Sequence, residues 1–69
     1  MTLNKRLAAN LKILRKERQL TQQVLAERAG IEYKYFQKIE GGIPLNITFE
    51  TLEKLSKALK ADVSELLKR

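Results

Sequence analysis

The chain has 69 residues and no cysteine, which excludes a disulfide framework, so we expect one domain over residues 1–69 that folds on a single small apolar core. It has no apolar run near the roughly 18 residues of a membrane span and no signal-peptide core at its start, so we expect a cytoplasmic protein with no membrane partner. The 14 basic and 8 acidic side chains give a net charge of +6, which favours a polyanionic partner.

A leucine stripe predicts a first helix from about Thr2 to Glu17. The leucines recur with the i, i+4, i+8 and i+11 spacing of one helix face, at Leu3, Leu7, Leu11 and Leu14. Three lysines fall off this stripe, so we expect them in solvent: Lys5, Lys12 and Lys16.

Residues 21–40 have the pattern of two short helices joined by a tight turn. Thr21 is a good N-cap for the first helix, and Gly30 stands where that helix would end with a positive φ. Five apolar residues give each helix one buried face: Leu25, Ala29, Ile31, Phe36 and Ile39. Ala26 is small enough for the helices to cross closely. These features predict a helix-turn-helix at about residues 21–40, and the alternative is an ordinary helical hairpin in a small bundle.

The second of these helices, from about Tyr33 to Glu40, has an unusual polar face. With Phe36 and Ile39 turned inward, a rotation of about 100° per residue places four side chains outward: Tyr33, Lys34, Gln37 and Lys38. Tyr35 lies at the edge of this face. Lysine can donate to guanine, glutamine can bond adenine, and tyrosine can reach a phosphate or a thymine methyl group. We therefore interpret the face as a candidate reader of bases in the major groove of DNA; the alternative is a solvated helix face.

The rest of the chain predicts two further helices and hence an all-α, five-helix fold. The glycines at 41–42 end the third helix, and Pro44 excludes helix from the segment that follows. Thr48 and Asp62 are suitable N-caps for a fourth and a fifth helix. The fourth helix has its own apolar stripe, formed by Leu52, Leu55 and Leu59.

The two halves of the chain differ in charge. Residues 1–40 have nine Lys and Arg against four Glu, a net +5, whereas residues 41–69 have five against four acidic side chains, a net +1. The near-neutral half also has more large apolar residues than so small a core needs. We therefore expect a homodimer whose interface lies in this half and includes Leu45, Ile47, Phe49, Val63 and Leu67.

The stretch LKILRKERQLTQQVLAERAGIEYKYFQKIEGG resembles the helix-turn-helix of phage repressors and Cro proteins, and is similar to restriction-modification controller proteins. The similarity continues through TLEKLSKALKADVSELL, so it covers residues 11–67. Residues 41–48 form a segment one residue longer than the commonest form of the family, so the family conformation is not carried over there. Lys60 stands where the family usually has glycine, which implies a strained left-handed residue.

The resemblance also implies roles for individual residues. Arg15 would pair with Glu40 in a partly buried ion pair that joins the first helix to the third. Gln22 would contact the DNA backbone and could also brace the third helix. The base readers would be Tyr33, Lys34 and Lys38, with Gln37 beside them, while Gln23 and Tyr35 would touch the backbone.

Catalytic chemistry has no support in the composition. Histidine is absent and Asp62 is the only aspartate, which leaves no plausible metal site and no His- or Cys-based nucleophile. We expect no enzymatic activity, no cofactor and no small-molecule effector. The resemblance implies a transcription regulator that binds double-stranded DNA as a homodimer on a two-fold symmetric operator. The alternative is an antitoxin-like or other protein-interaction module; an antitoxin would be expected to add a toxin-binding segment, and we expect none after Arg69.

Overall fold

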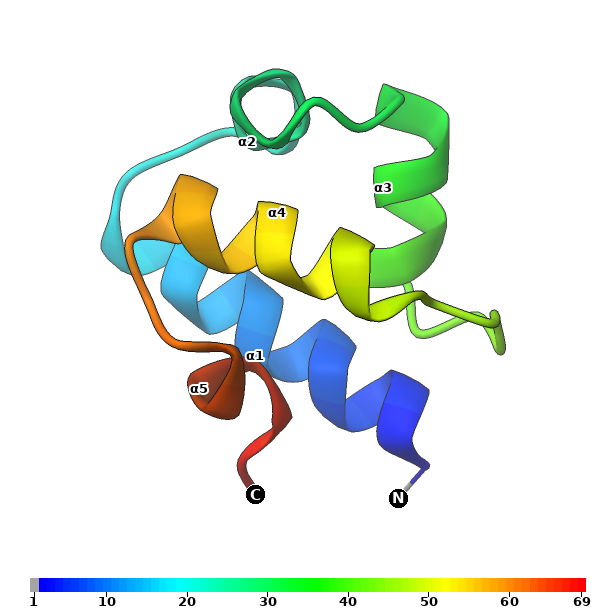
Figure 1. Cartoon of the computed structure of the whole chain (residues 1–69). Helices are drawn as coiled ribbons and strands as arrows, with labels where there is room; N and C mark the ends of the chain where they lie inside the picture. Colours follow the sequence, from blue (N-terminus) through cyan, green and yellow to red (C-terminus); the bar gives the residue numbers. More distant parts are fainter. Residues whose placement is uncertain (1) are drawn as a thin grey trace.

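The computed structural model describes residues 2–69, which form five helices and no strand (Figure 1). In chain order these are α1 (Leu3–Glu17), α2 (Gln22–Ala29), α3 (Tyr33–Glu40), α4 (Phe49–Leu59) and α5 (Val63–Leu67). The prediction of an all-α, five-helix fold is confirmed. Within residues 2–69, no helix is both long enough and apolar enough to cross a membrane.

Four of the five helices begin with a capping hydrogen bond that involves a side chain, whereas Glu32, the residue before α3, makes none. The hydroxyl groups of Thr2, Thr21 and Thr48 each accept a hydrogen bond, of 3.1 to 3.2 Å, from the backbone N–H three residues further on. At α5 the backbone N–H of Asp62 donates to Oε2 of Glu65, 2.9 Å away. The start predicted for α1 at Thr2 is therefore the N-cap, and the helix itself begins at Leu3.

All five helices contribute to one apolar core. The largest fully buried side chains come from every element: Leu11, Leu25, Phe36, Ile39, Leu55, Leu59 and Leu66. Leu3, which the leucine stripe placed on the buried face, is instead exposed. It lies in the first turn of α1, and the buried part of the stripe begins one turn later, at Leu7.

The packing puts α2 and α3 on one side of the molecule, whereas α5 and both chain ends lie on the other side (Figure 1). Helix α1 packs against α3 and α5, and α2 packs against α3 and α4. This arrangement leaves one flank of α3 without a neighbouring helix.

Four of residues 2–69 have a left-handed backbone. Gly30 and Gly42 have φ of 70° and 76°, which costs little without a Cβ atom. Lys60 has φ of 54°, as its position after α4 implies, and Gln19 has φ of 57°, which the sequence pattern did not indicate. Such a conformation is strained for a residue with a side chain.

The irregular segment 43–48 is held by a contact from the first helix. Asn4 Nδ2 donates a hydrogen bond of 3.0 Å to the backbone carbonyl of Leu45. Leu45 and Ile47 in turn pack against the edge of the core. The longer segment between α3 and α4 is thereby tied to α1.

Candidate nucleic-acid interface

Helix α3 has two faces with different tasks. Phe36, Ile39 and Glu40 are buried, and Tyr35 is half-buried against the edge of the core. The opposite flank consists of exposed side chains, which we call the α3 outer face: Tyr33, Lys34, Gln37 and Lys38. The predicted rotation of the helix is thus the observed one. The two lysines make this flank basic, and its donors and acceptors are free to meet a partner from solvent.

A buried carboxylate fixes the inner face of α3. The side chain of Glu40 is 1% exposed and faces the guanidinium of Arg15 on α1. Arg15 Nε donates to Glu40 Oε2 and Arg15 Nη2 donates to Glu40 Oε1, both at 2.9 Å. This two-pronged geometry is the strong form of an arginine–carboxylate pair, and it fixes the direction as well as the distance between α1 and α3.

The Arg15–Glu40 pair also makes hydrogen bonds to the turn before α2 and to the start of that helix. Arg15 Nη1 donates to the backbone carbonyl of Leu20 at 2.8 Å, and Gln22 Nε2 donates to Glu40 Oε1 at 2.9 Å. The resulting Arg15–Glu40–Gln22 network joins the end of α1, the start of α2 and the end of α3. It holds the two helices of the helix-turn-helix at a fixed angle, so the α3 outer face is presented on a rigid support.

One hydrogen-bond donor of the Gln22 side chain is therefore already used within the protein. Its amide group is half-buried and gives one N–H to Glu40, so the second N–H is the donor that remains for a phosphate oxygen. Gln23, the next residue in the first turn of α2, is exposed. Both lie at a helix N-terminus, where backbone N–H groups and the helix dipole favour an anion.

A sequence model of the Cro/C1-type helix-turn-helix DNA-binding domain matches residues 10–69 of the chain. The chain belongs to this family. It is accordingly a helix-turn-helix transcription regulator whose partner is double-stranded DNA, and the resemblance to phage repressors and Cro proteins is confirmed.

Solved structures agree with this assignment to the Cro/C1 type. The restriction-modification controller C.AhdI from Aeromonas hydrophila is 28% identical, with a TM-score of 0.85 over 91% of this chain and 94% of that one. The N-terminal DNA-binding domain of SinR from Bacillus subtilis is 33% identical, with a TM-score of 0.84 over 91% of each chain. The clp gene regulator ClgR from C. glutamicum is 28% identical, with a TM-score of 0.86 over 97% of this chain and 86% of that one. A search among curated proteins gives no match.

Two polar side chains of this Cro/C1-type domain do structural work that the sequence pattern did not indicate. Arg18, at the end of α1, donates from Nε to the backbone carbonyl of Leu59 at the end of α4. Asn10 is buried in α1 and donates from Nδ2 to the carbonyls of Leu66 and Lys68, at 2.9 and 2.7 Å. Each pair is more than 40 residues apart in the chain, so no local spacing could have indicated it.

The residues expected at a dimer interface fall into two groups. Leu45, Ile47 and Leu67 pack against the edge of the core, so part of their apolar surface is already covered within the protomer, and Val63 is half-buried. Phe49 is different, because it is 63% exposed at the first position of α4.

Among residues 2–69, no three His, Cys, Asp or Glu side chains gather as a metal-ion site would require.

Proposed function

We propose that the α3 outer face enters the major groove and that Tyr33, Lys34, Gln37 and Lys38 contact base edges. The observation that supports this proposal is the composition of the one flank of α3 that packs against no other helix. Lysine suits guanine O6 and N7, and glutamine suits adenine. A recognition helix of a helix-turn-helix protein contacts bases from the same kind of exposed flank.

Backbone contacts are assigned to Gln22 and Gln23 in the first turn of α2 and to Tyr35 at the edge of α3. Gln23 is exposed at the N-terminus of α2, where a phosphate is favoured. Gln22 would use its second amide N–H, and the bond to Glu40 would hold that amide in one orientation. These contacts would set the position of the protein on DNA without selecting a base.

The protein would act as a homodimer on a two-fold symmetric operator. One copy presents a single eight-residue recognition helix and so contacts only a few base pairs, and a second copy related by a dyad doubles the site. Phe49 is 63% exposed and supports an interface in the C-terminal half, together with the partly exposed Leu45, Ile47, Val63 and Leu67. Half-sites would then lie about one helical turn, ~34 Å, apart.

The role closest to this design is that of a phage-type repressor or a controller of a restriction-modification system, as C.AhdI is described. Such a regulator has no enzymatic activity, works in the cytoplasm where the DNA is, and needs no small-molecule effector because its concentration sets operator occupancy. A protein-interaction or antitoxin-like module remains the second candidate. It would not show the steep salt dependence of DNA binding that phosphate contacts produce.

Two kinds of variant test the proposal, once selection from random duplexes has supplied the preferred site. Lys34→Ala and Lys38→Ala should each cost roughly 1–3 kcal/mol on that site and relax the preference at particular base pairs. Gln23→Ala should weaken binding to all sequences about equally, because it removes a backbone contact and no structural bond. Lys54→Ala, an exposed lysine of α4, is the control. Competition titrations against scrambled duplexes measure both effects; uniform losses from both α3 lysine variants would exclude α3 as the base reader.

A further inference from the structure

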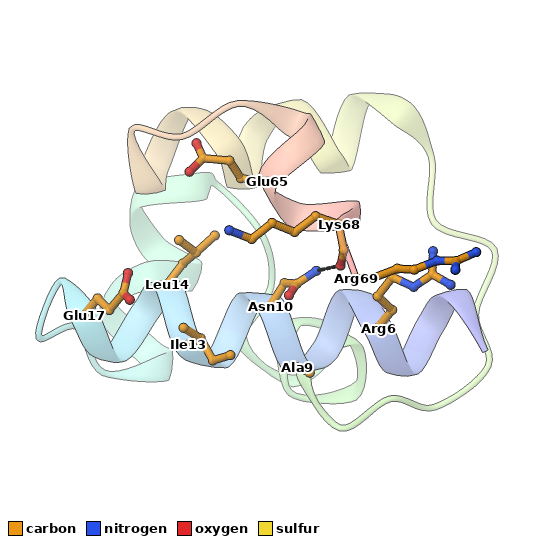
Figure 2. A pocket seen from close by; sticks show the side chains of 9 residues that line it. All are labelled: Arg6, Ala9, Asn10, Ile13, Leu14, Glu17, Glu65, Lys68 and Arg69. Atoms are coloured by element: carbon orange, nitrogen blue, oxygen red, sulfur yellow. Dashed lines mark hydrogen bonds between the residues drawn. The ribbon is translucent and has the colours of Figure 1, made fainter. Parts of the chain in front are cut away.

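An apolar surface separate from Phe49 lies on the side of the molecule opposite α2 and α3. It is a groove of about 870 Å³ between one flank of α1 and the end of the chain after α5 (Figure 2). Ala9, Ile13 and Leu14 form its apolar floor. Ile13 is 56% exposed, so α1 leaves a large aliphatic side chain in solvent at the middle of the groove.

The groove has a preformed wall. Asn10 sits at its base and uses both amide hydrogens on the carbonyls of Leu66 and Lys68. Figure 2 shows Lys68 and Arg69 held along α1 in this way. The donors of the buried amide are satisfied internally, so what the groove offers to a partner is apolar surface and the charges at its rim.

Those charges are separated along α1. Along α1, Arg6 and Arg69 lie at one end of the groove and Glu17 at the other, while Glu65 and Lys68 border it from α5 and the end of the chain (Figure 2). At about 100° per residue, Arg6, Ile13 and Glu17 lie within an arc of about 40° on the helix, and the separation of 11 positions from Arg6 to Glu17 corresponds to about 16 Å. Glu17 also lies 3.6 Å from Arg18, yet its side chain is 63% exposed and faces solvent.

We propose that this groove binds the same groove of a second copy of the chain, with the two α1 helices antiparallel. A two-fold axis between residues 11 and 12 would place Arg6 of each copy against Glu17 of the other, since the two residues are equally far from that axis. Ile13 lies only about 2 Å along the helix from the same point, so the two isoleucines meet and Ala9 leaves room for close approach. Opposite charges would thus meet at both ends of the contact, as a self-complementary two-fold interface requires.

This contact goes beyond the proposed operator binding and uses a different face from Phe49. The groove is lined by residues of α1, α5 and the end of the chain and by none of α2 or α3, so a copy bound to DNA through α3 would keep it open. One helix pair buries less than a standard interface, so the association is weak in dilute solution and gains strength where copies are concentrated on neighbouring sites. DNA also neutralises the net charge of +6 that makes free copies repel.

Disulfide trapping can detect a weak contact, because the covalent link persists after it forms. The native chain has no cysteine, so only an introduced cysteine can react. Ile13→Cys, at the proposed axis, should give a disulfide-linked dimer under mild oxidation. Lys12→Cys, one residue away but about 100° around the helix, is the matched control and should cross-link much more slowly. Equal rates for the two variants would overturn the proposal and leave the groove to a different partner.

Charge reversal then tests the antiparallel geometry. In the Ile13→Cys background, Arg6→Glu and Glu17→Arg should each slow cross-linking roughly ten-fold, because two attractive contacts become repulsive. A mixture of the two variants should recover the original rate, since in the mixed pair each of the two contacts again joins one acidic and one basic side chain. Lys12→Glu, which changes the charge as much as Arg6→Glu, should have little effect. Single reversals that leave the rate unchanged, or a mixture no faster than its parts, would overturn the antiparallel pairing.

Discussion

Glu40 accepts two hydrogen bonds from Arg15 and one from Gln22 while its side chain is almost completely buried. Removing one partner of such a buried pair leaves an uncompensated charge or an unfilled donor. Glu40→Gln should therefore lower the free energy of unfolding by about 3 kcal/mol, and Arg15→Met by a similar amount. In a small domain whose total stability is on the order of 5 kcal/mol, either variant would be near unfolding at room temperature. Urea midpoints measure the effect, and losses within ~0.5 kcal/mol would show that the pair contributes little.

A double variant separates the pair from its surroundings. Arg15→Met combined with Glu40→Leu removes both charges, so it should cost clearly less than the sum of the two single changes. The coupling energy from this cycle should exceed about 1 kcal/mol. Additive losses would instead mean that each side chain acts through packing alone.

At the scale of single residues, the sequence predicted which residues belong to the site better than it predicted the hydrogen bonds that they make. The pairing of Arg15 with Glu40 followed from resemblance, and the geometry adds that Gln22 shares the same carboxylate. Gln22→Ala is consequently a mixed variant that loses a structural bond and a proposed DNA contact together. The positive φ of Gln19 belongs to the turn that ends α1, where the backbone N–H of Gln19 donates to the Lys16 carbonyl and that of Leu20 to the Arg15 carbonyl; no glycine marks this turn in the sequence.

Helix α4 ends at Lys60, whose left-handed backbone is strained for a residue that has a side chain. Lys60 has φ of 54°, a region that costs a residue with a Cβ atom about 1–2 kcal/mol. Lys60→Gly relieves this strain, and the extra freedom of glycine in the unfolded chain offsets part of the gain. The variant should be more stable by about 0.5–1 kcal/mol, which raises the melting temperature of a domain this size by a few degrees.

The control for this change is Lys57→Gly, three residues earlier on the same helix. Lys57 is exposed and has ordinary helical geometry, so glycine there should destabilise by about 1 kcal/mol. Opposite signs for the two substitutions identify the left-handed backbone as the cause. If Lys60→Gly is also destabilising, the lysine side chain contributes a contact that outweighs the strain.

At the scale of helices, local signals were sufficient for most boundaries. Thr21, Thr48 and Asp62 stood before apolar stripes, and each is the N-cap of a helix. Segment 43–48 could not be predicted beyond the exclusion of helix by Pro44. Its course depends on a bond from Asn4, which is 41 residues away from Leu45.

For the whole molecule, the proposed dimer depends most on Phe49. Phe49→Glu should give a folded monomer, because Phe49 is exposed and a glutamate in the first turn of α4 is favoured by the helix dipole. Leu67→Glu is a poorer test, since Leu67 packs against the core and its loss would also destabilise the fold. Operator affinity should fall by roughly 100-fold or more, because each half-site must then be bound separately.

Sedimentation and titration with the operator duplex measure both consequences of Phe49→Glu. Lys54→Gln changes the charge of α4 by the same amount and should leave the mass and affinity unchanged. A dimer of unaltered stability in the Phe49→Glu variant would place the interface elsewhere.

The spatial arrangement of the helices was predictable only through the resemblance. Helical periodicity gives five amphipathic segments, but the side of the molecule on which α5 lies is decided by Asn10 and by Leu66 in the core. The dimer residues were predicted because the C-terminal half has more apolar residues than the core needs. Three of them, Leu45, Ile47 and Leu67, pack against the edge of that core. Surface and core are hard to distinguish in a short chain, because nearly every large apolar residue is close to both.

The division of α3 into two flanks has a consequence for how such proteins diversify. Phe36, Ile39 and Glu40 hold the helix, whereas the four side chains of the α3 outer face are exposed and support no other element. Those four positions can be exchanged as a set with little effect on folding. A duplicated gene could therefore acquire a new target site in a few substitutions while its product stays folded at every step.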